Sequence, residues 1–588
     1  LDVQYGVQYD VTNTQAFSGE DSYSTRKEIE KSRLITGPFI PTGGIIKNTD
    51  ATSFQYTLKN MLRYSKLVGD YHEFEVMVGN ELRRSTDESV FSAAYGYDPN
   101  TLTSKPVIYP DESYALQFPL FRRNYYENAF VSFFGTGSYT FKRRYTFGSS
   151  IRYDGSNIFG VDPKYRYLPL YSVSGLWRAS EEAFLKDVSW LSDLRFRASY
   201  GLQGNIDKST SPKLVGEWKP DVTILPGVNE PNITVSSPPN ERLRWEKTAT
   251  YNVGFDLAVI NNRYKISADY YQRESTDLIG MKQLPLETGF AYTTINWSSL
   301  TNKGVELNLS ALLVKTDKLS WDMQVNFSYN YNRVNRVTVR SDQRTPVTES
   351  YPVGAIFTLP YAGLDQYGYP LIYNANGEAV LLTDLLQLRQ GIGGSIERGL
   401  SALDERSLYN YSGTDEAPYS GGFTNIIRYK NWDFYASVVS NFGHNYLVQP
   451  YYSLTGYDRG LNVSSEILNR WTDENPNGYL PRLITAGSLG GTRVTEYGGY
   501  SDFAYDKYFS LWLRDAGYIR LQSVRIGYAV PEKFAKKLRL QNLKVNVEAK
   551  NLFVYGFDYK GFLDPETMKN PFAQPIPRSV TLSVNLGF

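Results

Sequence analysis

The carboxy-terminal residues of the chain alternate strictly between apolar and polar side chains. The apolar positions from 580 onward are Val580, Leu582, Val584, Leu586 and Phe588, and every intervening residue is polar or glycine. Successive side chains of a β-strand point to opposite faces, so a period of two predicts a strand with one apolar face. The same period recurs along the whole chain, which constrains the fold to an all-β architecture.

The polar positions of these segments carry charges and amides. In the segment 543–550 they are Lys544, Asn546, Glu548 and Lys550. A polar face of this kind suits a water-filled lumen better than a packed core. In the segment 321–331 the apolar set begins at Trp321 and ends at Tyr331. Ten residues of a tilted strand rise about 23–25 Å, which is about the height of the apolar band between two aromatic girdles of a membrane barrel.

Composition excludes several classes of protein. The 588 residues include no Cys and two His, and 62 basic residues balance 61 acidic ones, so neither a disulfide framework nor a basic nucleic-acid surface is expected. No apolar run approaches the length of about 18 residues that a spanning helix needs. Aromatic residues make up 15% of the chain although the mean hydropathy is −0.40. Composition alone leaves open a membrane barrel and a large soluble all-β protein such as a propeller.

Connection lengths distinguish these two folds. Sixteen strands are predicted, near 1–17, 52–67, 72–85, 126–140, 144–155, 170–182, 193–204, 244–260, 263–275, 301–314, 319–332, 421–430, 431–442, 518–530, 541–553 and 578–588. Short turns alternate with long excursions, among them 18–51, 86–125, 205–243, 333–420 and 443–517. Outer-membrane barrels have short periplasmic turns and long extracellular loops. The alternation therefore favours a transmembrane antiparallel β-barrel that occupies residues 1–588.

The two ends of the chain add expectations of their own. The long connection 554–577 precedes the last strand, so that strand is expected to end in the periplasm. An aromatic Phe588 on an alternating strand resembles the signal that barrel-assembly machinery recognises. At the other end, alternation begins at Leu1 with no charged and apolar leader, so no signal peptide is predicted. The segments 1–17 and 580–588 are expected to be edge strands, with other polypeptide between them.

Several motifs in order resemble the SusC/RagA family of TonB-linked outer-membrane transporters. They run from about residue 125 to the end and include SSIRYDGSNIFG at 149–160, LRFRASYGLQGN at 194–205, NKGVE at 302–306 and NRWTDENPN at 469–477. In the last motif Asp473 stands where the family usually has Pro. The resemblance implies a barrel of twenty-two strands filled by a plug domain. The sixteen strands predicted here imply that about six strands, the plug and the TonB-binding segment are not in this chain.

No catalytic or metal site is predicted, and no cofactor is expected. His72 and His444 lie far apart in sequence and lack a third ligand or a paired nucleophile. The sequence 473–478 opens like a Ca²⁺ loop, but Ile484 occupies the position of the bidentate Glu, so a turn is predicted. The glycine-rich stretch 391–394 lacks the Lys-Ser/Thr of a phosphate-binding loop. The chain is therefore not expected to be an enzyme.

Binding surface is expected in the long loops instead. The loop 443–517 is rich in aromatic residues, which stack on sugars or anchor a protein partner because they offer rigid area at low entropic cost. The candidate contacts with a substrate or a lid protein are Tyr451, Tyr452, Tyr457, Trp471 and Tyr479. The alternative is that such residues pack the loop onto its neighbours. The apolar residues in 86–125, 333–420 and 443–517 predict that these loops are ordered, partly against one another and partly against a lid protein over the extracellular mouth.

The resemblance implies import of bulky nutrients, oligosaccharides or peptides, across the outer membrane of a Gram-negative cell. The implied partners are a SusD-like surface lipoprotein that caps the barrel, the inner-membrane TonB complex, the barrel-assembly machinery and the lipid bilayer. Two other functions stay open. The first is a passive sixteen-stranded porin, for which this chain would be complete, and the second is a surface adhesion or secretion barrel that transports nothing.

Overall fold

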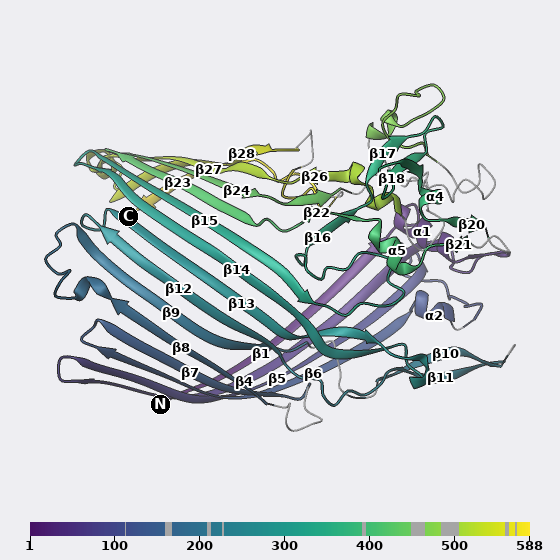
Figure 1. Cartoon of the computed structure of the whole chain (residues 1–588), viewed down its shortest axis with the longest axis horizontal. Coiled ribbons are helices and arrows are strands. Elements are labelled where there is room, and N and C mark those ends of the chain that lie inside the picture. Colours follow the sequence, from purple (N-terminus) through teal and green to yellow (C-terminus); the bar gives the residue numbers. More distant parts are fainter. Residues whose placement is uncertain are drawn as a thin grey trace.

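One antiparallel sheet of sixteen strands dominates the computed structural model of the chain (Figure 1). The structure describes residues 1–111, 113–158, 167–207, 213, 215–225, 228–390, 396–448, 465–483, 505–558, 564–570 and 573–588. In order along the sheet the strands are β1 (Asp2–Ser18), β4 (Gly44–Val68), β5 (His72–Tyr97), β6 (Phe121–Phe141), β7 (Tyr145–Ser156), β8 (Tyr167–Arg178), β9 (Leu191–Asn205), β12 (Glu246–Val259), β13 (Tyr264–Gln283), β14 (Tyr292–Lys315), β15 (Leu319–Arg336), β23 (Tyr419–Tyr429), β24 (Trp432–Phe442), β27 (Tyr518–Ala529), β28 (Asn542–Gly556) and β29 (Ser579–Gly587). Each predicted strand is present in the predicted order.

Short turns join the strands at one end of the sheet, and both chain termini lie toward that end (Figure 1). The turn between β12 and β13 uses Asn261 and Asn262 with φ of 52° and 61°. Asn tolerates this left-handed conformation, whose twist matches that of the flanking strands. Two turns are longer and contain η1 (Ala179–Glu181) and α6 (Glu532–Lys537). No helix among the described residues is long and apolar enough to cross a membrane.

The other end of the sheet carries loops with their own secondary structure. The first loops contain α1 (Tyr23–Lys31), β2 (Arg33–Leu34), β3 (Gly37–Pro38), α2 (Ser113–Gln117), β10 (Val215–Leu225), β11 (Val228–Ser237) and η2 (Leu286–Thr288). The loop after β15 contains β16 (Ala355–Thr358), β17 (Tyr361–Leu364), β18 (Pro370–Tyr373), β19 (Ala379–Leu381), α4 (Leu382–Leu385), β20 (Leu388–Gln390), β21 (Ile396–Arg398), α5 (Ala402–Ser407) and β22 (Asn410–Thr414). The loop after β24 contains β25 (Asn445–Leu447), η4 (Ser465–Asn469), η6 (Tyr505–Tyr508), η7 (Ser510–Trp512) and β26 (Leu513–Asp515).

The register gives the sheet one apolar and one polar face. Between β14 and β15, Leu307 pairs with Phe327 on the apolar face, while Asn308 pairs with Asn326 on the polar face. Uncovered apolar side chains recur along the apolar face, and Val253 on β12 is 59% exposed. An apolar surface that extends over so many strands requires a cover, and a lipid bilayer covers such a face on a strand-built wall.

The apolar face ends partway along the tallest strands. On β5 it runs from Phe74 to Leu82, and the next outward residue, Arg84, forms an ion pair with Glu127 of β6 at 2.8 Å. Within the apolar band, Asn60 and Asn80 pair with each other through a 3.0 Å hydrogen bond, which satisfies part of their polar capacity. β4 and β5 therefore continue as a polar wall beyond the membrane-facing band.

The sheet is open along β1 and β29. β1 pairs with β4 and β29 pairs with β28, and these two edge strands do not pair with each other. The expectation that residues 1–17 and 580–588 are edge strands is thus confirmed. That other polypeptide lies between the two edges stays a prediction.

The loops after β15 and β24 fold together into a rim lobe, defined by the buried cluster Leu359, Tyr369, Ile372, Leu382, Leu386, Tyr409, Ile467, Leu480, Phe509 and Trp512. Leu359 to Tyr409 come from the first loop, and Ile467 to Trp512 come from the second. Backbone hydrogen bonds cross between them, from Leu359 N to Tyr508 O at 2.8 Å and from Ser510 N to Leu359 O at 3.0 Å. The prediction that the loops 333–420 and 443–517 pack against one another is confirmed for their described residues.

Candidate functional site

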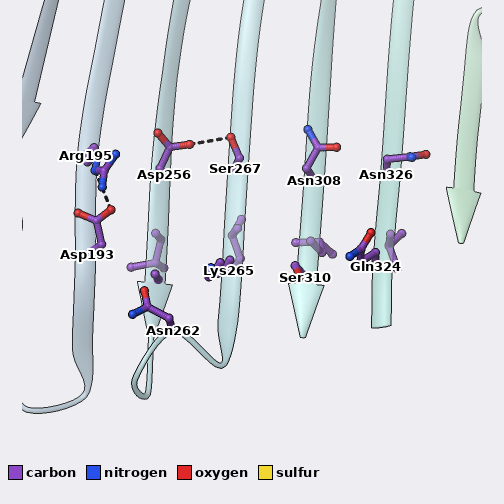
Figure 2. A pocket seen from close by; sticks show the side chains of 15 residues that line it. Asp193, Arg195, Asp256, Asn262, Lys265, Ser267, Asn308, Ser310, Gln324 and Asn326 are labelled. Carbon is purple, nitrogen blue, oxygen red and sulfur yellow. Dashed lines mark hydrogen bonds and ion pairs between the residues drawn. The ribbon is translucent and has the colours of Figure 1, made fainter. Parts of the chain in front are cut away.

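Two regions of the molecule combine polar surface with a defined shape: the polar face of the sheet and the rim around the long loops. On the polar face, five neighbouring strands from β9 to β15 line a cavity of about 470 Å³ near the short turns (Figure 2). The register sets Ser267, Asn308 and Asn326 in one row and Lys265, Ser310 and Gln324 in the next. Strand alternation alone therefore produces a grid of hydroxyl and amide groups.

Most of the charges beside this grid are neutralised by their neighbours. Arg197 of β9 lies between Asp256 and Asp269, at 3.1 and 3.0 Å, and Arg195 contacts Asp193 at 2.7 Å. The Ser267 hydroxyl donates to Asp256 at 2.7 Å (Figure 2). The wall thus presents hydrogen-bonding groups with little net charge.

Glycines on the polar face give neighbouring side chains room to lie flat. A Cβ at Gly304 would meet the Tyr271 hydroxyl at 2.7 Å, and one at Gly422 would meet Oδ1 of Asn326 at 2.7 Å. The Tyr271 hydroxyl instead reaches across β14 and donates to Oδ1 of Asn330 at 3.0 Å. At these positions no side chain projects from the glycines of the polar face into the lumen.

The two histidines do not assemble a site. Nδ1 of His72, beside a short turn, lies 2.9 Å from the Tyr139 hydroxyl, whereas His444 is buried at the rim. Burial lowers the pKa of His444, and the carboxylates of Asp515 and Asp415 oppose that shift. Within the described ranges no three His, Asp or Glu side chains are grouped to hold a metal ion. The predicted turn after Trp471 is present, with Asn475 N donating to the Thr472 hydroxyl oxygen at 2.9 Å.

The structure separates the aromatic candidates of the rim. Trp471 is 7% exposed, and the Arg482 guanidinium lies 5.0 Å from the centre of its ring, so Trp471 packs within the lobe. Tyr479 is 51% exposed and donates from its hydroxyl to Glu466 at 2.9 Å. Tyr451, Tyr452 and Tyr457 lie outside the described residues. Phe588 is exposed at the end of the last edge strand, and its role in assembly stays a prediction.

A buried ionic contact at the rim was not found by sequence reasoning. Arg520, on the polar face of β27, contacts Asp564 and Glu566 in the loop between β28 and β29. The same loop reaches the segment after β22 through an ion pair between Lys569 and Asp415. Arg520 sits in an ordinary alternating strand and Asp564 in an unpatterned loop, so no local signal connects them.

This wall and its folded rim define a strand-built outer-membrane protein. The profile of the family described as "TonB dependent receptor-like, beta-barrel" matches residues 1–552. The chain therefore belongs to this family of outer-membrane β-barrels.

Relatives place the chain near the group whose motifs it carries. It is 28% identical to the TonB-dependent receptor SusC of Bacteroides thetaiotaomicron over 92% of this chain and 50% of that protein. It is 26% identical to the TonB-dependent receptor P26 of Formosa agariphila over 97% of this chain and 57% of that protein. The resemblance to the SusC/RagA family is thereby confirmed.

Among solved structures, the RagAB peptide importer in the "closed-closed" state has the same fold. Its TM-score is 0.73 at 21% identity, covering 100% of this chain and 60% of that one. The chain spans between half and three fifths of the length of each of these three proteins.

Proposed function

We propose that the chain forms the larger part of the wall of a TonB-dependent importer that brings bulky nutrients across the outer membrane. The observation that carries this proposal is the polar wall of Figure 2, a hydrogen-bonding surface with little net charge on the inside of an outer-membrane barrel of this family. Grid rows of Ser, Asn and Gln form transient hydrogen bonds with a hydroxyl- or amide-rich solute. Substrates are oligosaccharides or peptides too large for porins.

We propose further that a SusD-like surface lipoprotein covers the mouth and docks partly on the rim lobe. The RagAB complex named among the solved structures is an importer of peptides. On the lobe of the present chain, Tyr479, Tyr367 and Leu468 are all more than half exposed. Exposed aromatic and apolar side chains on a rigid support are suitable anchors for a protein partner.

Transport is tested in the producing bacterium with the full-length protein. Cells with and without the gene are given fluorescent oligosaccharides and peptides above the porin size limit, and uptake is measured with and without a functional TonB complex. If the protein is a TonB-dependent importer, uptake should be lost both in cells without the gene and in cells without a functional TonB complex. Uptake that depends on the gene and continues without TonB would establish the passive porin instead. Altered adhesion or secretion with no change in uptake of any probe would establish the third alternative.

Lid docking is tested separately by co-purification from membranes. Deleting the whole loop 443–517 would remove Ile467, Leu480, Phe509 and Trp512 from the lobe core, so surface substitutions are the sharper test. The double variant Tyr479→Ala and Leu468→Ala is expected to retain less lipoprotein than the native chain. The matched control is Phe534→Ala on α6, an exposed aromatic in the turn between β27 and β28 at the opposite end. Full retention by the double variant would exclude this surface as the docking site.

A further inference from the structure

At the rim, β15 extends past the residue at which its neighbour β23 begins. The last pair is Tyr329 with Tyr419, yet β15 continues to Arg336. Beyond the last pair, a segment of the rim lobe runs along β15, with Val334 N donating to Tyr351 O and Ser350 N donating to Val334 O, both at 2.8 Å. A cavity of about 380 Å³, here called the rim notch, lies between this segment and Pro418. Its volume falls within the range of about 300–1,000 Å³ for small-ligand sites.

Four tyrosine rings line the rim notch: Tyr329, Tyr331, Tyr351 and Tyr411. The rings of Tyr351 and Tyr411 lie 4.8 Å apart at 31°, and Tyr411 is 44% exposed. No hydrogen bond joins any of the four hydroxyls to another described residue. The notch therefore offers aromatic faces together with hydroxyl groups that are free to donate and accept.

Two further polar groups in the lining have unused hydrogen-bonding capacity. Oδ1 of Asn330 accepts from the Tyr271 hydroxyl, while the amide NH₂ of Asn330 has no partner in the described part of the chain. The Glu416 carboxylate lines the notch and forms no ion pair within the described residues, although its charge acts on the Lys569 ammonium at longer range. Hydroxyls, an amide and a carboxylate around aromatic faces match the groups on a sugar ring.

The charges around the notch argue against an ionic ligand. The Lys303 ammonium already stands over the Tyr331 ring at 5.2 Å, and the Arg333 guanidinium donates to the Ser350 hydroxyl oxygen at 3.4 Å. A cationic ligand would be repelled by these two positive charges, and the face of the Tyr331 ring that could attract it is already occupied by Lys303. An anionic group would meet Glu416 and find no cation among the lining residues. A neutral ligand avoids both conflicts.

We propose that the rim notch binds a neutral pyranose unit of a glycan. Asn330 and Asn332 reach the notch from the polar face of β15, and Tyr329 and Tyr331 reach it from the apolar face. The lining of the notch thus includes side chains from both faces of β15, and its sugar comes from one of two sources. It is a unit of the imported oligosaccharide, which rests on the proposed function, or it is a glycan headgroup of the surrounding membrane surface.

The test measures saccharide binding to the purified full-length protein in detergent by isothermal titration calorimetry. The probes are maltohexaose, cellohexaose and mannohexaose for the cargo source, and a purified lipopolysaccharide core oligosaccharide for the membrane source. Binding of at least one probe is expected, weakened at least tenfold by Tyr411→Ala and several-fold by Tyr411→Phe, which keeps the ring. Glu416→Gln, which preserves shape, is expected to weaken binding without altering the fold. Tyr373→Ala, an exposed tyrosine on β18 outside the notch, is the matched control.

The outcomes distinguish a cargo glycan from a membrane glycan, and they distinguish failure of sugar binding at the rim notch from failure of the proposed import function. Binding of a hexasaccharide that depends on Tyr411 and Glu416 supports the cargo source, and equivalent binding of the core oligosaccharide alone supports the membrane source. Absence of binding by every probe, or binding that neither Tyr411→Ala nor Glu416→Gln weakens, overturns the inference. TonB-dependent uptake would persist in that case if the proposed import function is correct, so the two failures are separable.

Discussion

The guanidinium of Arg520 and the carboxylate of Asp564 form a contact of 2.5 Å in which each side chain is 3% exposed. Arg520 belongs to the wall at β27, and Asp564 belongs to the loop between β28 and β29. Glu566 of the same loop holds Nε of Arg520 at 2.5 Å. Two carboxylates from one loop thus contact the single guanidinium of Arg520 on the wall. These contacts hold the loop against the inside of the rim.

Removal of one partner is expected to release that loop. Asp564→Ala leaves the buried guanidinium with Glu566 alone, and breaking a buried ion pair from one side costs up to about 3–5 kcal/mol. Limited proteolysis of the full-length protein should show faster cleavage in 557–578. Asp342→Ala, which removes an exposed ion pair with Arg340, serves as control and should leave cleavage unchanged. Equal cleavage of the native and Asp564→Ala proteins would show that the contact does not hold the loop.

Adjacent residues on β15 should differ sharply in their tolerance of charge. Val325 pairs with Leu309 on the apolar face, and Asn326 pairs with Asn308 on the polar face. Arg in place of a lipid-facing residue at the membrane midplane costs about 2–4 kcal/mol, whereas Arg in place of a lumen residue stays hydrated. Val325→Arg should therefore lower the yield of folded protein in membranes, and Asn326→Arg should not. Similar yields of heat-modifiable, folded barrel from both variants would mean that the faces are assigned wrongly.

The alternation of apolar and polar residues predicts the membrane-crossing part of each strand. It does not predict how far the strands continue beyond the membrane. The predicted strand 52–67 begins at Gly44 in the structure, and the predicted strand 72–85 continues to Tyr97. Beyond the apolar band the outward positions become polar, as at Arg84 and Glu88, because water replaces lipid there. Pairing continues where the apolar signal has stopped, so the hydrophobic pattern could not mark the upper strand ends.

The site was less accessible to sequence reasoning than the fold. The aromatic composition of loop 443–517 predicted binding surface there, but not that Trp471 is buried and Tyr479 is half exposed. The rim notch is lined by both Tyr331 of β15 and Tyr411 of β22, and it lies where β15 extends past the start of β23. Such a cavity arises where the loop after β15 packs back against that strand, and no periodic signal in the sequence encodes it.

The two described aromatic candidates should behave in opposite ways. Trp471→Ala removes a buried ring beside Gly368 and Arg482, and truncation of a buried aromatic costs about 3–5 kcal/mol. The rim lobe of this variant should open, which increases protease cleavage within 337–418 and 443–517. Tyr479→Ala, at a half-exposed position, should leave cleavage near the native rate. A stable lobe in Trp471→Ala would show that the ring is not part of its core.

Acidification should loosen the rim through His444. Burial lowers the pKa of this imidazole and the carboxylates of Asp515 and Asp415 only partly offset it, while the Tyr446 ring packs at 5.4 Å. A lowered folded pKa means that the unfolded rim binds more protons at mildly acid pH. The contribution to stability is therefore complete above the unfolded value of about 6.5 and declines as the pH falls from there toward the folded pKa. Protease cleavage at the rim, followed from about pH 7.5 to about 5.5, should rise in the native protein and rise less in His444→Gln. His72→Gln, beside a short turn at the other end, should keep the native slope, and an unchanged slope in His444→Gln would assign the effect to other groups.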